Sequence, residues 1–165
     1  MTDSAGILAW RRGAEGVELF LVHPGGPFWK NKDVHGWSIP KGELDAGEED
    51  LLAAACREFR EETGQSVDEA IGASALASSA VALPAVRHGG KTIHAFAVEC
   101  PAGGGPDPGR LRSNEFELEW PPRSGRRQRF PEVDRAAWVP LDDALEKLHR
   151  NQQALLDHLR ALVGG

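Results

Sequence analysis

The sequence has little cysteine, because Cys56 and Cys100 are the only two in 165 residues. Two cysteines so far apart provide neither a disulfide framework nor the paired spacing of a zinc site. Runs of apolar residues long enough to cross a bilayer are also missing, and the first residues lack the basic-then-apolar pattern of a signal peptide. We therefore expect a protein of the cytoplasm that makes no membrane contact.

Basic residues are outnumbered, with 19 Lys and Arg against 25 Asp and Glu and a net charge of −6. This balance argues against general nucleic-acid binding, although it leaves room for a local basic site. The hydrophobic share of 41% is ordinary for a soluble globular chain. The length and the absence of internal repeats predict a single domain over residues 1–165, and the sequence leaves the oligomeric state open.

The apolar runs are short and are separated by Gly and Pro, which is typical of strands. A hairpin is expected first, and a second turn is expected at residues 88–91. The segment 73–86 is small and apolar without a helical period. Helices are expected over 51–62, after a cap at Asp142, and over 151–163. Together these elements predict an α/β fold with a mixed sheet. The expected strands cover residues 4–10, 17–23, 37–39, 92–100 and 136–139.

A charged segment precedes the last expected strand. Glutamates at 115, 117 and 119 alternate with apolar residues, which predicts a strand with one charged side. Pro121 and Pro122 end it, and a basic loop follows. The loop is either solvated or a phosphate site, since Arg forks bind phosphate oxygens in pairs. Its arginines are Arg123, Arg126, Arg127 and Arg129.

The stretch 40–64 organises the chain, because a Pro-Lys-Gly turn leads into a helix that Gly64 ends. On that helix Glu58, Glu61 and Glu62 share a face that differs from the apolar one. Clustered carboxylates are either a solvated acidic face or hard ligands for Mg²⁺ or Mn²⁺, which also bind substrate phosphates. A bound cation would also remove their mutual repulsion.

The same stretch resembles the Nudix box, Gly-x5-Glu-x7-Arg-Glu-U-x-Glu-Glu-x-Gly-U, in which U is aliphatic. Two departures are present. Gln65 stands where an aliphatic residue is usual, and the loop before the helix holds one extra residue. Counting forward from Gly42 assigns the box glutamate to Glu48, whereas counting back from Arg57 assigns it to Glu49. The matching positions are Gly42, Arg57, Glu58, Phe59, Glu61, Glu62 and Gly64.

The resemblance implies a mixed sheet between helices and the hydrolysis of a nucleoside diphosphate linked to another moiety. It implies metal ligation by Glu58, Glu61, Glu62 and the carbonyl of Gly42, with Arg57 orienting the box glutamate. The segment 130–138 is similar to one that precedes the last helix of diadenosine polyphosphate hydrolases. On that ground Glu132 is expected as a fourth acidic contributor, with a strand-edge role as the alternative.

The Trp-x-x-Pro-Lys-Gly lead-in resembles bacterial diadenosine polyphosphate hydrolases, although that branch commonly has a downstream tyrosine and this chain has none. A dinucleoside polyphosphate or nucleoside triphosphate is therefore the expected substrate. Lys41, Arg126 and Arg127 would meet phosphate, and Trp29 would stack on a base or fold back on the core. The alternatives are an oxidised-nucleotide sanitiser, an ADP-ribose or nucleotide-sugar pyrophosphatase, and a sensor without turnover.

Overall fold

The computed structural model describes residues 2–71 and 79–164. Its strands are β1 (Thr2–Gly13), β2 (Gly16–Pro24), β3 (Lys41–Glu43), β4 (Val81–Ala82), β5 (Val86–His88), β6 (Lys91–Glu99), β7 (Glu115–Glu119), β8 (Arg127–Pro131) and β9 (Val133–Pro140). Its helices are α1 (Leu51–Thr63), α2 (Val67–Ile71), α4 (Leu141–Lys147) and α5 (Ala154–Val163), with 3₁₀ turns η1 (Pro108–Arg110) and η2 (Arg150–Gln152).

A mixed sheet forms the centre of the molecule. Among the described residues its main path runs β4-β6-β1-β2-β9, with β3 also paired to β1 and β5 to β6. The pairing of β1 with β6 is parallel, and the neighbouring pairings are antiparallel. The α/β fold with a mixed sheet, predicted from the order of the elements, is confirmed.

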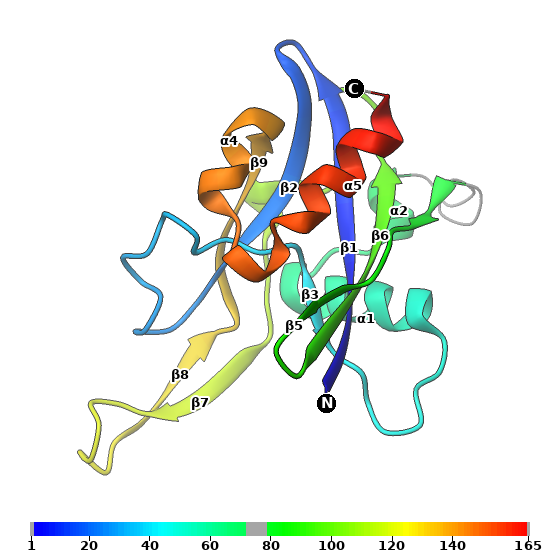
Figure 1. The fold of residues 1–165 in the computed structure, drawn as a ribbon. Coiled ribbons are helices and arrows are strands. Elements are labelled where there is room, and N and C mark those ends of the chain that lie inside the picture. Colours follow the sequence, from blue (N-terminus) through cyan, green and yellow to red (C-terminus); the bar gives the residue numbers. More distant parts are fainter. Residues whose placement is uncertain (1, 72–78, 165) are drawn as a thin grey trace.

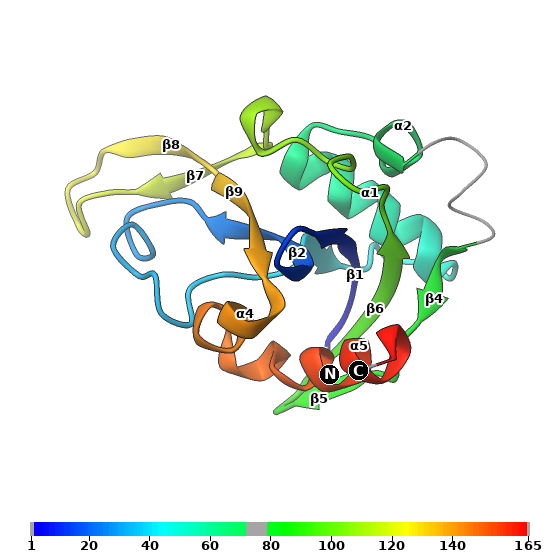
Figure 2. The same ribbon diagram turned by 90° about the horizontal axis from the view of Figure 1, so that it is seen from above.

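Helices cover both faces of this sheet, as Figure 2 shows: α1 and α2 lie on one side, and α4 and α5 on the other. Two apolar cores result because alternate residues of a strand point to opposite faces. Phe20 packs with Phe59 of α1 in one core, while Leu19 and Leu21 pack with Leu155 and other residues of the α4–α5 side in the second. The central strands are therefore buried on both faces.

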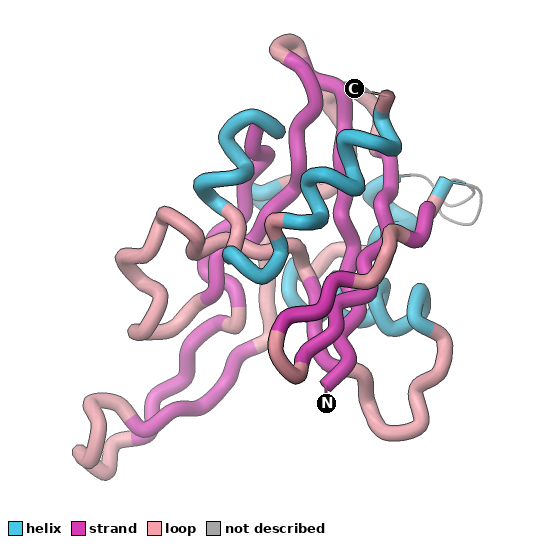
Figure 3. The backbone as a smooth tube through the Cα atoms, viewed as in Figure 1, coloured by secondary structure: helices cyan, strands magenta, loops and turns pink. Residues whose placement is uncertain are grey.

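The first hairpin and the turn at residues 88–91 form as expected, with Gly13 opposite Gly16 and His88 opposite Lys91. The expected segment 73–86 lies partly outside the described residues, and β4 is found in its described portion. The strand expected at residues 37–39 is wrong, because Trp37 and Ser38 form only isolated bridges. Figure 3 shows the connection from β2 to β3 as loop.

Two further expectations need correction. Asp142 does not cap α4, since Pro140 holds the N-cap position and no side chain makes a capping hydrogen bond there. The basic segment after Pro122 is a strand in part, because β8 pairs with β7 in a separate two-stranded sheet. This hairpin extends away from the central sheet (Figure 1). No described helix is long and apolar enough to cross a membrane.

Candidate active site

Helix α1 presents the acidic residues beside the sheet. Asp50 caps it by accepting a hydrogen bond from Ala53 N at 3.1 Å, and Gly64 ends it with a φ of 73°. Such a left-handed residue favours glycine. Phe59 anchors the opposite face of the helix against Phe20, with ring centroids 6.1 Å apart. The predicted helix is confirmed, and its anchored face fixes the direction in which the acidic face points.

The turn before α1 approaches the helix so closely that a side chain is excluded at Gly42. A Cβ atom added there would lie 1.9 Å from Oε2 of Glu58. Gly42 pairs with Ala5 in the sheet, so its backbone position is fixed from the other side. The Glu58 carboxylate therefore lies directly against the backbone of Gly42.

Arg57 gathers three carboxylates around one guanidinium group. Its Nε and Nη2 atoms donate to the two oxygens of Glu48 at 3.1 and 2.9 Å. Its Nη1 atom donates to Glu58 Oε1 at 2.8 Å and to Glu61 Oε1 at 3.1 Å. The paired bond lowers the pKa of Glu48 below its usual value. Arg57 thus orients the acidic residues of the site.

The extra loop residue leaves Glu48, not Glu49, in contact with Arg57. Glu48 also accepts a hydrogen bond from Asp45 N at 2.9 Å, which closes the loop into a turn. Glu49 is exposed and makes no hydrogen bond or ion pair within the described parts of the chain. Of the two candidates, the structure thus places Glu48 at Arg57.

Glu62 and Glu132 complete the acidic group. Glu62 accepts a hydrogen bond from Lys41 N at 3.1 Å, yet burial raises its pKa to about 8. Burial also raises the pKa of Glu132, and the charge of Glu61 adds to that shift. Glu132 lies between β8 and β9, where its amide donates to Asn114 O at 2.8 Å. The structure therefore brings Glu132 to the helix-borne carboxylates.

This donor set fits a hard divalent cation. Carboxylate and carbonyl oxygens are the ligands that Mg²⁺ and Mn²⁺ prefer. Burial is the main cause of the raised pKa values, with repulsion between carboxylates adding to it, and a cation would favour the charged form of each group. Within residues 2–71 and 79–164 no three acidic, His or Cys side chains already surround one point closely enough to hold an ion. Glu58 and Glu61 instead each direct one oxygen to Arg57.

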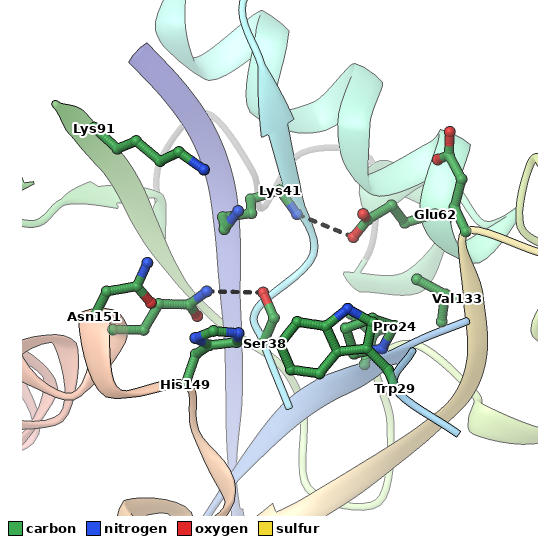
Figure 4. A pocket seen from close by; sticks show the side chains of 12 residues that line it. Pro24, Trp29, Ser38, Lys41, Glu62, Lys91, Val133, His149 and Asn151 are labelled. Atoms are coloured by element: carbon green, nitrogen blue, oxygen red, sulfur yellow. Dashed lines mark hydrogen bonds between the residues drawn. The ribbon is translucent and has the colours of Figure 1, made fainter. Parts of the chain in front are cut away.

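Two adjoining cavities lie over this acidic group, with volumes of about 580 Å³ and about 310 Å³. The larger one, here called the acidic cavity, is lined by Glu58, Glu61 and Gly42 among others. The smaller one, here called the lysine cavity, is shown in Figure 4. Both are lined by Pro24, Trp29, Lys41, Glu62 and Glu132.

Trp29 forms part of the wall between the cavities. Its ring lies 5.0 Å from the His149 ring, and the Lys32 ammonium group lies 5.0 Å from its centroid. The side chain is thus packed on one side and borders open space on the other. Lys41 lines both cavities, which places it beside any ligand that occupies them.

Arg126 and Arg127 do not reach this site. They belong to the β7–β8 hairpin and line neither cavity. Arg127 donates to Glu117 at 2.8 Å and Arg129 donates to Glu115 at 3.1 Å, so the charged side of the hairpin pairs with itself. Its apolar side faces the loop after β2, where Trp120 packs against Phe28 with centroids 5.2 Å apart. Arg126 and Arg127, which were expected to meet phosphate, therefore lie outside both cavities in the structure.

Three site residues escaped sequence analysis: Lys91, His149 and Asn151 line the lysine cavity. Lys91 opens β6, and its neighbours in the sequence carry no motif. The parallel pairing of β6 with β1 brings Lys91 near the Pro-Lys-Gly turn, and such a long-range pairing leaves no local pattern. His149 and Asn151 come from the turn before α5.

A family model described as the NUDIX domain matches residues 2–159. This match covers most of the chain, so the protein belongs to the Nudix family. A curated relative, the 8-oxo-(d)GTP phosphatase of Mycolicibacterium smegmatis, is 27% identical over 154 residues. The alignment covers 88% of this chain and 37% of the relative, so the chain spans little more than a third of that protein.

Solved structures show the same fold. The Ap4A hydrolase of C. elegans, in a binary complex, has a TM-score of 0.64 at 22% identity, covering 100% of this chain and 99% of that one. The NUDIX domain of Shewanella oneidensis NrtR, complexed with ADP ribose, has a TM-score of 0.59 at 15% identity, covering 98% and 87%. At such identities the likeness concerns the fold.

Proposed function

We propose that the protein hydrolyses a pyrophosphate bond in a nucleoside diphosphate linked to another moiety, with Mg²⁺ or Mn²⁺ bound at α1. The observation that carries this proposal is the convergence of Glu58, Glu61, Glu62 and Glu132 on the Gly42 turn. These residues line an open cavity, and the pKa values of three of them are raised. A purely solvated acidic face would not be buried against a turn in this way.

The ligands of the cation would be Glu58, Glu61, Glu62 and the carbonyl oxygen of Gly42. When bound, it would neutralise phosphate charge and lower the pKa of a coordinated water. The remaining work belongs to the chain, because positioning and charge neutralisation dominate phosphoryl transfer. Arg57 holds Glu48, Glu58 and Glu61 in place through four hydrogen bonds to their carboxylates.

Glu132 is the proposed base. It lines the acidic cavity, and burial raises the pKa of its carboxyl group above the usual value. A carboxylate with a raised pKa is a better proton acceptor at neutral pH, so it could take the proton of the attacking water. The oxygen of the water would form a bond to one phosphorus atom, and the bridging oxygen would leave on the other phosphate group.

For the substrate we propose a dinucleoside polyphosphate or a nucleoside triphosphate. Both cavities together can hold a chain of phosphates, and Trp29 presents an aromatic wall beside them. The named activity of the M. smegmatis relative supports a nucleoside triphosphate, including an oxidised one. The complex of the NrtR domain with ADP ribose favours, as the second candidate, an ADP-ribose or nucleotide-sugar pyrophosphatase. The intact acidic set argues against a sensor without turnover.

The test is a substrate screen with product identification. Diadenosine tetraphosphate, 8-oxo-dGTP, dGTP, ADP-ribose and a nucleotide sugar are incubated with the protein and Mg²⁺, and the products are separated by chromatography. Hydrolysis that stops in excess chelator, and that falls by on the order of 100-fold in Glu62→Gln and Glu132→Gln, is expected. Full activity of Glu62→Gln, or none with any substrate, contradicts the proposal. A strong preference for ADP-ribose moves it to the second candidate.

A further inference from the structure

His23 is a buried histidine whose two ring nitrogens both face oxygen acceptors. It stands near the end of β2 and is 0% exposed. Nδ1 lies 3.0 Å from a carboxylate oxygen of Asp134 in β9, and Nε2 lies 2.7 Å from the carbonyl oxygen of Lys32. Both distances are those of hydrogen bonds. These two contacts, here called the His23 clamp, link β9 to the loop between β2 and β3.

The two acceptors fix the number of protons in the clamp. A neutral imidazole has one N–H group, so its other nitrogen would present a lone pair to an oxygen atom. Two hydrogen bonds need an imidazolium ring, or a neutral ring whose Nδ1 accepts from a protonated Asp134. Either arrangement holds one proton more than a neutral ring beside a carboxylate. Arg135 Nε lies 3.5 Å from the same oxygen of Asp134, so we assign the extra proton to His23.

Lys32 belongs to the turn that carries Trp29. Its amide donates to Trp29 O at 3.0 Å, so the Lys32 carbonyl and the Trp29 backbone are parts of one turn. Gly36 lies close over the same carbonyl, because a Cβ atom added there would come within 2.1 Å of Lys32 O. Trp29 in turn lines both cavities. The position of this wall therefore depends on what holds the Lys32 carbonyl.

Other charged groups lie around the ring of His23. Trp37 packs against it with ring centroids 5.3 Å apart, and Trp37 Nε1 donates to Asp33 at 2.9 Å. The charged groups on the packed elements are Asp134 and Arg135 of β9, Lys32 and Asp33 of the loop, and Lys147 of α4, which pairs with Asp33. Asp134 contacts the ring directly and supplies the counter-charge that a buried imidazolium requires.

We propose that His23 is the positioning residue of the Trp29 wall and that its imidazolium form holds the clamp closed. His23 lines neither cavity, so it acts on a substrate only through Trp29. A ring that loses one proton can donate to only one of its two acceptors. The clamp is therefore complete at low pH and opens as pH rises past the loss of that proton. Its kinetic consequence rests on the proposed function, whereas its structure does not.

The first measurement follows the ring and the loop in one titration. Chelator-treated protein with ¹⁵N in its histidine rings is titrated by NMR, and the His23 signals are assigned by their loss in His23→Gln. Hydrogen exchange of residues 25–36, corrected for the intrinsic effect of pH, reports loop opening at the same pH values. Both nitrogens should carry protons while the loop is protected, and protection should fall when one proton is lost. A protected loop beside a neutral ring overturns the clamp.

Asp134→Asn should make the clamp independent of pH. The new amide can donate to Nδ1 of a neutral ring, so Nε2–H still reaches Lys32 O at high pH. Loop protection should then stay level where the wild type loses about threefold or more. Asp157→Asn makes the same change at an exposed position of α5 and should behave as the wild type. Loop protection in Asp134→Asn that falls with pH as in the wild type overturns the assigned proton.

Kinetics separate positioning from a purely structural role. In active protein, His23→Gln should raise KM by about threefold or more and change kcat less, because a displaced Trp29 weakens ground-state binding. His158→Gln, on α5 and outside both cavities, should leave both constants unchanged. A fall in kcat without a change in KM overturns the positioning role. If His23→Gln does not fold, the KM of Asp134→Asn decides, since it should stay level at the pH where that of the wild type rises.

This clamp and the proposed function can fail separately. Protein whose loop follows the His23 proton but that hydrolyses no nucleotide supports the clamp and rules out the activity. Protein that hydrolyses nucleotides while loop protection ignores the His23 proton keeps the activity and rules out the clamp.

Discussion

Gly42 shows how a single residue can hold the site together by having no side chain. Its backbone lies against the Glu58 carboxylate, where a Cβ atom would come within 1.9 Å of Oε2 and 2.1 Å of Cδ. The neighbour cannot give way cheaply, because Glu58 is tied to Arg57 at 2.8 Å. The glycine of the turn is therefore required by contact, and not by an unusual φ angle.

We expect Gly42→Ala to displace the Glu58 carboxylate and lower kcat by at least about tenfold, since a small misplacement of a positioned group is costly. Gly90→Ala is the matched control, because a Cβ atom there meets nothing within 4 Å and no positive φ is involved. Steady-state kinetics and thermal melts of both variants provide the measurement. Unchanged kinetics in Gly42→Ala would mean that the close approach does not matter for the chemistry.

Glu48 and Glu49 give a second prediction at this scale. Glu48→Gln should lower activity, because it weakens the paired hydrogen bond that orients Arg57 and, through it, Glu58 and Glu61. A loss of about 10–100-fold is typical when a residue that orients metal ligands is changed. Glu49→Gln carries the same chemical change at an exposed position and should match the wild type. Equal, small losses in kcat for both variants would remove Glu48 from the site.

At the scale of elements, the β7–β8 hairpin is the segment whose position differs from the expectation. Its arginines were expected to meet phosphate, and they lie outside both cavities. Its charged residues pair across the two strands, as diagonal neighbours do in an antiparallel ladder. Its apolar residues pack on the loop after β2, and Phe116 and Phe28 border the acidic cavity. The apolar side of the hairpin thus forms part of the wall of the acidic cavity.

For this element we compare the KM of each variant, Arg126→Gln or Arg127→Gln, with the KM of the wild type. We expect the ratio of the two values to be the same for substrates of every phosphate-chain length. Arg127→Gln should cost less than about 1 kcal/mol of unfolding free energy, because its pair with Glu117 is exposed. Kinetics with diadenosine compounds of different chain lengths, and denaturant melts, are the measurements. A ratio of variant to wild-type KM that rises steeply with chain length would show that the hairpin closes over the substrate.

At the scale of the whole molecule, the buried acidic group makes stability depend on pH. Burial raises the pKa of Glu62 from 4.5 to about 8, so the folded state favours the protonated carboxyl group. The resulting stabilisation is complete below the unfolded pKa and is lost as pH rises through the folded one. Metal-free protein should therefore become less stable between about pH 5 and pH 8.5, and each pKa unit corresponds to about 1.4 kcal/mol.

Glu62→Gln should remove much of this slope. In the presence of a chelator, the variant should be more stable than the wild type at pH 8.5, by on the order of 1 kcal/mol. At pH 5 the two proteins should have similar stability. Glu49→Gln serves as the control, since Glu49 is exposed. The measurement is differential scanning calorimetry across that pH range. Parallel curves for wild type and Glu62→Gln would show that Glu62 does not ionise against a burial penalty.

The sequence by itself determined what depends on local periodicity and turn chemistry. It predicted α1 to within a residue at its end, the first hairpin, the turn at residues 88–91, and a shared face for Glu58, Glu61 and Glu62. It also selected the mixed α/β class, because the order of strands and helices excludes a repeated parallel unit. These features follow from contacts within a few residues or from one amphipathic pattern.

Only the tertiary structure decided which distant residues meet. The parallel pairing of β1 with β6 brings Lys91 to Lys41, the junction of β8 and β9 brings Glu132 to α1, and Arg57 selects Glu48 over Glu49. The pairing of β7 with β8 likewise places Arg127 against Glu117 and away from the cavities. Which distant residues come into contact depends on packing and charge interactions across the whole folded chain. A local sequence pattern does not contain these interactions.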